Sequence, residues 1–173
     1  MRRLVLAIAA VTVVGSFVAA CGDDDGGDGT LNGAPEELVG DWSGGLKQTG
    51  LPSFRVAVRF DQGGLDGRPP AVAYTGIECG GTWTWEGTGE SNPPTYVFEE
   101  EIDQGSGGEC KGSGRVEIHP AEPCRKPAAN ECDYRRLRYR FSGGGVTSTG
   151  VLTPASDDEL GRIFEEAGVD LDE

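Results

Sequence analysis

The sequence predicts an all-β protein: about eight antiparallel strands in a meander closed into a lipocalin-like barrel, or folded into a sandwich, with a short C-terminal helix. Three observations indicate this. Apolar and polar residues alternate at period two between residues 38 and 154, Gly-rich segments separate the alternating stretches, and no helical pattern lies between them. Such alternation is typical of strands with one buried face, and consecutive strands without intervening helices usually pair. Closure into a barrel would remove exposed strand edges, whereas a Greek-key sandwich is the alternative.

Eight stretches have the strand pattern. They are 41–49, 54–61, 70–77, 81–87, 95–102, 114–119, 134–141 and 146–153. The second is the clearest, because large apolar residues occupy every other position from Phe54 to Phe60. Glycine accounts for 29 of the 173 residues, which suits tight turns and sharply bent strands.

A helix is predicted after residue 154. Ser156 and Glu159 have the spacing of a capping box, and Gly168 is a suitable C-terminal stop. Between them, apolar residues recur at helical spacing: Leu160, Ile163, Phe164 and Ala167. A helix of about twelve residues is only marginally stable alone, so we expect its apolar stripe to pack on the β domain.

The N-terminus has the layout of a secretory signal peptide. Arg2 and Arg3 precede an apolar run over 4–20. The run ends in Val18-Ala19-Ala20-Cys21, which resembles the lipobox of bacterial lipoproteins. The resemblance implies removal of residues 1–20, attachment of diacylglycerol and an amide-linked acyl chain such as palmitate to Cys21, and anchoring on the extracytoplasmic face of the cell membrane. A membrane-spanning anchor is disfavoured because the run is shorter than the roughly twenty apolar residues needed, and an ordinary signal peptide cut after Ala20 is the other alternative.

The predicted mature chain divides into three parts. Residues 21–37 form a Gly/Asp-rich tether behind the lipidated cysteine, 38–154 form the β domain, and 155–173 form the helix and tail. The whole chain has a net charge of −14, and without Arg2 and Arg3 it has 13 basic and 29 acidic residues, a net charge of −16. This charge repels nucleic acid and anionic lipid headgroups, so membrane contact is expected through the lipid alone. We expect a monomer.

Four cysteines follow the lipobox. They are Cys79, Cys110, Cys124 and Cys132. In an oxidising compartment they predict two disulfides with three possible pairings. The pairs Cys79–Cys110 and Cys124–Cys132 are favoured, because the second closes a short loop between strands that has no core of its own. A zinc site is disfavoured, because the spacing lacks C-x₂-C and the chain has a single histidine, His119. No metal or cofactor is predicted.

The candidates for chemistry are few. With His119 alone and no Gly-x-Ser-x-Gly motif, no catalytic residue is predicted. Glu100 is unusual because it shares a strand face with Tyr96, Phe98 and Ile102. If that face is interior, the carboxylate needs a cation or hydrogen-bond donors. Arg135 is the predicted partner, and the alternative places Glu100 in water near the barrel mouth.

Aromatic residues complete the candidate set. Trp83 and Trp85 share a face, and Trp42 begins the first strand. They either fill the core or line a ligand site. The candidate ligand-binding residues are Glu100, Trp83, Trp85, Tyr96, Phe98, Arg135 and Tyr139.

A wider pattern runs over residues 38–153. Its parts are Gly40-Asp-Trp42-Ser-Gly44 with Gln48, the strand from Phe54 to Phe60, Tyr74, Cys79-Gly80-Gly81, Tyr96-x-Phe98-x-Glu100-x-Ile102, Cys110-x-Gly112-x-Gly114-x-Val116 and Leu137-x-Tyr139. The pattern resembles a small extracytoplasmic domain of actinobacterial lipoproteins and of some transmembrane serine/threonine protein kinases. The resemblance implies an all-β sensory or binding domain, and Cys79 and Cys110 are the cysteines that match those of that domain. The segment 120–132 and the C-terminal helix depart from it, so a shared partner is not implied.

Three functions therefore compete. The leading expectation is a lipid-anchored, non-enzymatic binding or sensing module for a small molecule or an envelope component. The second is a lipocalin-like carrier whose apolar cavity is lined by Trp83, Trp85, Tyr96, Phe98 and Tyr139. The third is a hydrolase using Glu100 and a second carboxylate. A cavity larger than about 300 Å³ would favour the carrier, and two carboxylates about 5–10 Å apart in a cleft would favour the hydrolase.

Overall fold

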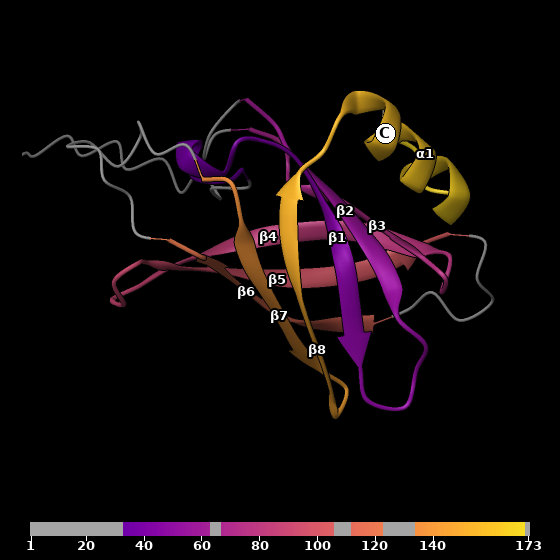
Figure 1. Ribbon diagram of the computed structural model, residues 1–173, viewed down its shortest axis with the longest axis horizontal. Helices are drawn as coiled ribbons and strands as arrows, with labels where there is room; N and C mark the ends of the chain where they lie inside the picture. Colours follow the sequence, from indigo (N-terminus) through magenta and orange to yellow (C-terminus); the bar gives the residue numbers. More distant parts are fainter. Residues whose placement is uncertain (1–32, 63–66, 106–111, 123–133, 172–173) are drawn as a thin grey trace, which may run out of the picture.

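The described residues of the computed structural model, 33–62, 67–105, 112–122 and 134–171, form a closed eight-stranded antiparallel barrel with one helix on its outside (Figure 1). The strands are β1 (Gly40–Gln48), β2 (Phe54–Phe60), β3 (Ala71–Thr75), β4 (Cys79–Gly89), β5 (Thr95–Gln104), β6 (Gly112–Pro120), β7 (Leu137–Gly143) and β8 (Val146–Pro154). A 3-10 helix, η1 (Glu36–Leu38), precedes β1, and α1 (Asp157–Ala167) follows β8. Each strand pairs with its neighbours in sequence, and β1 pairs with β8. The barrel is confirmed, and the sandwich alternative is wrong.

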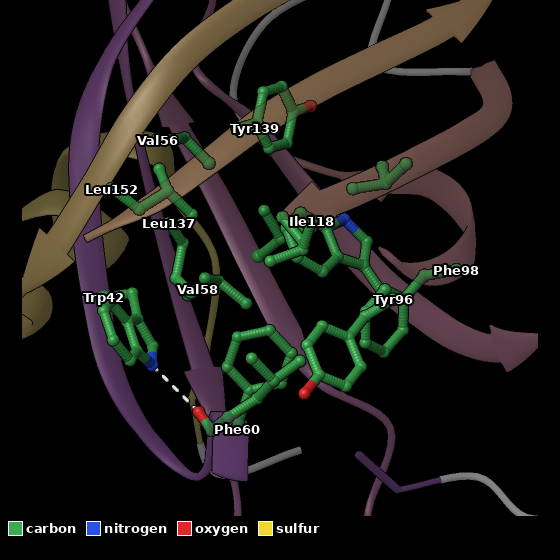
Figure 2. Packing of buried hydrophobic residues seen from close by; sticks show 14 of the residues in the cluster. Trp42, Val56, Val58, Phe60, Tyr96, Phe98, Ile118, Leu137, Tyr139 and Leu152 are labelled. Carbon is green, nitrogen blue, oxygen red and sulfur yellow. Dashed lines mark hydrogen bonds between the residues drawn. The ribbon is translucent and has the colours of Figure 1, made fainter. Parts of the chain in front are cut away.

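The interior is filled by the alternating residues that predicted the strands. In β2, Phe54, Val56, Val58 and Phe60 are buried on the inner side. Trp83, Phe98 and Phe60 meet in the middle of this core, with ring centroids 5.6–5.9 Å apart. Figure 2 shows Tyr139 at one end of the buried cluster and Phe60 with Tyr96 at the other. The barrel is therefore packed with side chains along part of its length.

One end of the barrel is covered by the segment before β1. Leu38 in η1 is fully buried, Ala34 is 2% exposed, and both belong to the barrel core. The indole of Trp42 donates a hydrogen bond of 2.9 Å to the Leu38 carbonyl oxygen (Figure 2). We call this the closed end. The domain therefore begins before residue 38, and part of the segment assigned to the tether belongs to the core.

The C-terminal helix packs against the outer face of β2 and β3, as its apolar stripe predicted. Leu160, Ile163 and Phe164 are buried against Ala57 and Ala73, whose small side chains allow close approach. The helix ends have the expected caps. The Ser156 hydroxyl accepts a hydrogen bond of 3.2 Å from the Glu159 amide, and Gly168 adopts φ 71°.

Several predictions concern residues outside the described ranges. These are the signal peptide, Cys21 and its lipid, and Cys110, Cys124 and Cys132, so the disulfide pairing stays a prediction. Cys79 is described and lies 8% exposed at the start of β4. Across the described ranges, no helix combines the length and apolar character needed to span a bilayer.

Candidate functional site

A cavity of about 270 Å³ opens at the end of the barrel opposite η1, and we call this end the mouth. It lies where β1, β3, β5 and β7 end and where β2, β4, β6 and β8 begin. In Figure 1 the β1–β2 connection and the β7–β8 turn meet at the bottom of the view. The lining residues are Gln48, Phe54, Tyr74, Ile77, Cys79, Glu100, Ile102, Gly112, Ser113, Tyr139, Phe141, Gly143, Gly144, Val146 and Ser148.

The cavity wall is largely apolar. Its lining includes the apolar side chains of Ile77, Ile102, Phe54, Phe141 and Val146. Polar groups lie on β1 and β8, where the Ser148 hydroxyl donates to the Gln48 side-chain oxygen at 2.6 Å. A few polar groups in an apolar hollow are typical of small-molecule sites.

Glu100 lines the inner end of the cavity, toward the barrel core, with only 3% of its surface exposed. Its position on β5 directs it inward, because Phe98 and Ile102 occupy the same face. The indole of Trp83, directly across on β4, donates a hydrogen bond of 2.7 Å to Glu100 Oε1. The hydroxyl of Tyr74, from β3, donates to the same oxygen. The partners of this buried acid are thus two neutral donors.

A second tyrosine extends this network. The hydroxyl oxygens of Tyr74 and Tyr139 are 3.1 Å apart. A phenol has a single proton, and that of Tyr74 is directed to Glu100, so Tyr139 is the donor in the tyrosine pair. The protons of Tyr139, Tyr74 and Trp83 therefore all point along the network toward Glu100 Oε1. We call Glu100, Tyr74 and Tyr139 the cavity floor.

The other carboxylate oxygen of Glu100 faces the cavity. Both hydrogen bonds to Glu100 end on Oε1. Within the described ranges, no fully buried side-chain oxygen or nitrogen lacks a hydrogen-bond partner. Oε2 has none, so it must be reached by solvent, and Glu100 borders the cavity. An oxygen of a nearly buried carboxylate thus remains free to accept a hydrogen bond from the cavity side.

Burial is the main cause of the raised pKa values of the three side chains of the cavity floor. Desolvation raises the pKa of Glu100, while the hydrogen bonds from Tyr74 and Trp83 favour the carboxylate and partly oppose that shift. Desolvation, together with the nearby Glu100 charge, raises the pKa of Tyr74 and of Tyr139 well above the usual range. Both phenols therefore stay protonated at physiological pH and act as the donors described above.

The predicted site residues do not form one site, because some line the cavity and others lie in the filled core or at the closed end. Glu100 and Tyr139 line the cavity, and Trp83 lies beside them with 0% exposure. Phe98 belongs to the filled core, and Trp85 is partly buried against it. These positions agree with the core-filling interpretation of Trp83, although its N–H also reaches the floor.

Tyr96 serves the closed end of the barrel. Its hydroxyl donates to Glu37 at 2.9 Å and lies 3.4 Å from the Tyr134 hydroxyl. Desolvation is the main reason that its pKa is raised, and the hydrogen bonds with Tyr134 and Glu37 add to it. The Tyr96 hydroxyl therefore helps to hold η1 and does not contribute to the cavity.

The expected pair between Glu100 and Arg135 is wrong. Arg135 is exposed, precedes the first residue of β7, and makes no ion pair with Glu100. Its assignment assumed that the alternation of Leu137 and Tyr139 extends back by one more step. The strand begins at Leu137, so position 135 does not share its inward direction.

The most important residue that the candidate set omitted is Tyr74. It is 3% exposed and supplies a hydrogen bond to Glu100 across the barrel interior. The available signal was its phase, because Tyr74 alternates with Val72 on the inner face of β3. A tyrosine hydroxyl on an interior face needs a hydrogen-bond partner. Among the acids of β5, Glu100 is the one whose position in the alternation also directs it to the interior. The candidate set also lacks four further residues that line the cavity: Phe54, Phe141, Gln48 and Ser148.

No group of three or more potential metal ligands occurs among the described histidine, cysteine, aspartate and glutamate residues. Comparison with known proteins adds no assignment: no protein family, no curated protein and no solved structure matches the chain.

Proposed function

We propose that this chain is a lipid-anchored, extracytoplasmic binding or sensing module, non-enzymatic, whose small ligand occupies the barrel mouth above Glu100. The observation that carries the proposal is the mouth cavity itself, an apolar hollow with an open carboxylate oxygen at its floor. The lipobox at Cys21 supports the anchoring. The size of the cavity restricts the ligand to a small molecule or to one end of a larger one.

The carrier alternative has less support. The cavity of about 270 Å³ falls slightly below the roughly 300–1,000 Å³ typical of drug-sized ligands. Trp83 and Phe98 occupy the space that a deeper apolar pocket would need. For the hydrolase alternative, Glu100 is the one carboxylate among the described lining residues, so this cavity supplies no observed second carboxylate for that chemistry.

Extraction of the native ligand tests the binding proposal. The full chain is purified from membranes and the small molecules released on unfolding are identified by mass spectrometry. Ser148→Phe should fill the cavity, because Ser148 is 3% exposed and lines it. Thr149→Phe, at the next and exposed position of β8, is the matched control. A molecule should co-purify with the wild type and the control and be absent from Ser148→Phe. Equal recovery from all three, with folding verified by circular dichroism, would contradict the proposal.

The anchor is tested separately by intact-mass analysis. The membrane-extracted protein should begin at Cys21 and have the added mass of a diacylglycerol group. Cys21→Ser should move the protein out of the membrane fraction. Retention of residues 1–20 on an unmodified chain would contradict the anchored, extracytoplasmic assignment.

A further inference from the structure

Among the residues that the structure describes, the acid that lines the mouth cavity has no cation beside it. Among the described residues that line it, none is Lys, Arg or His, and Glu100 is the single acidic side chain. A buried carboxylate is strongly destabilised unless hydrogen bonds or an opposite charge compensate. Trp83 and Tyr74 satisfy Oε1, but Oε2 is left to the cavity. Within the described part of the site, the carboxylate therefore lacks an opposite charge, which a cationic ligand would supply.

The hydrogen-bond directions at the floor restrict the ligand further. Because the protons of Trp83, Tyr74 and Tyr139 are used within the network, none of them is directed to the cavity. With Glu100 ionised, the floor offers Oε2 and the remaining phenol lone pairs, all of which are acceptors. A ligand group that contacts this floor must therefore donate hydrogen bonds.

The walls favour an organic cation over a bare ion. Above the floor, the cavity is lined mainly by aliphatic and aromatic side chains, including Ile102, Phe141 and Phe54. An inorganic cation would lose its hydration here and find few oxygen ligands, whereas an apolar body would bury its surface favourably. Aromatic rings also attract ammonium groups through their negative faces.

We infer that the ligand of the barrel mouth is a small organic amine, bound as its ammonium ion with the N–H groups on Glu100 Oε2 and the apolar body against Ile102 and Phe141. This inference rests on the proposed function, because it names the chemical class of ligand for the same cavity. The acidic chain, with its net charge of −14, would also attract such a cation from solution.

Matched probes separate the amine inference from the wider binding proposal. Isothermal titration of the full chain uses 2-phenylethylammonium, the neutral 2-phenylethanol and the anionic phenylacetate, which share one aromatic body. The ammonium probe should bind about tenfold or more tightly than the alcohol, as expected for a charge-assisted hydrogen bond in a desolvated site. Phenylacetate should show no binding.

Glu100→Gln tests the residue itself. With the Gln carbonyl oxygen accepting from Trp83 and Tyr74, its NH₂ group would replace Oε2 and turn the acceptor at the cavity into a donor. The preference for the ammonium probe should disappear, so that it binds no more tightly than the alcohol. Glu99→Gln makes the same charge change on the exposed face of β5 and should leave the preference intact.

The outcomes distinguish the two proposals. Equal affinity for the ammonium and alcohol probes in the wild type would overturn the amine inference and leave a ligand-binding cavity in place. Tighter binding of phenylacetate, or equally effective competition by potassium or ammonium chloride, would also overturn it. If no probe binds and no native molecule is extracted, both the amine inference and the proposed binding function fail.

Discussion

Trp83 and Glu100 lie directly opposite each other on β4 and β5, and the indole N–H donates to the carboxylate at 2.7 Å inside the barrel. Both side chains are nearly inaccessible to solvent, at 0% and 3% exposure. A tryptophan that would otherwise be only a core residue thus stabilises the one acid in the cavity floor. Core packing and the candidate site are coupled through this pair.

Replacing Trp83 with Phe should affect both stability and ionisation. The variant keeps an aromatic ring but removes one of the two donors to Glu100 Oε1, which should lower the free energy of unfolding by about 1–3 kcal/mol. Losing a donor that favours the carboxylate should also raise the pKa of Glu100 further. Urea denaturation and carboxyl-carbon NMR titration measure the two effects. Trp85→Phe, which alters an aromatic residue that packs on Phe98, is the control and should leave the Glu100 titration unchanged.

Glu100→Gln should change how stability depends on pH. Burial raises the pKa of Glu100 from its ordinary value of 4.5, so the folded state binds this proton more tightly than the unfolded state. The resulting stabilisation is fully present below the unfolded pKa and is lost as the pH rises through the folded pKa. The Gln variant should therefore be more stable than the wild type at pH 7, and the difference should shrink toward pH 4.

Thermal unfolding of both proteins between pH 4 and pH 8 measures this dependence. Glu99→Gln provides the comparison, because it removes an exposed carboxylate from the same strand. A Glu100→Gln variant that is less stable than the wild type at pH 7, with an unaltered pH dependence, would show that the Glu100 charge is fully compensated in the folded state.

Gly44→Ala should destabilise the contact between β1 and β8. An added Cβ would lie 2.1 Å from the backbone oxygen of Val151, and a backbone atom cannot move aside as a side chain can. The expected cost is about 1–3 kcal/mol or more. Gly45→Ala is the matched control, since a Cβ there meets nothing within 4 Å. Similar unfolding midpoints for the two variants would contradict the close approach.

Phe164→Ala should loosen the C-terminal helix. Phe164 is 1% exposed and belongs to the cluster between α1 and the barrel, so truncation should cost about 3–5 kcal/mol. Relative to the wild type, amide hydrogen exchange in the variant should become faster in α1 and stay largely unchanged in β4 and β5. Glu165→Ala, at an exposed neighbouring position, should have little effect. Unchanged protection of α1 in Phe164→Ala would mean that the helix is held by other contacts.

The strands and the helix were predictable because their signals are local. Alternation at period two marks each strand, as from Phe54 to Phe60, and Ser156 with Gly168 marks the helix ends. The choice of a barrel over a sandwich depended on whether β1 meets β8. That pairing joins distant segments and leaves no local pattern in either strand.

The candidate site was only partly predictable for the same reason. The phase of Glu100 within its strand indicated an unusual interior acid, and the structure places it inside. Its partners depend on the register between β4 and β5, which shifts at Gly80/Gly81 and again at Trp85/Gly87. They also depend on Tyr74 reaching across the interior. Period-two alternation specifies a face but neither the register between strands nor the reach of a side chain across the interior. It also does not mark where β7 begins, which is why the prediction of Arg135 as the partner is wrong.

The position of η1 bears on how the mouth cavity would be presented if the chain is anchored at Cys21 as proposed. The described chain enters the barrel through Ala34 and Leu38 at the closed end, whereas the hollow opens at the opposite end. On a protein held by Cys21, that opening would look outward into the surrounding aqueous layer and away from the acyl chains. Such an arrangement suits the sampling of dissolved solutes.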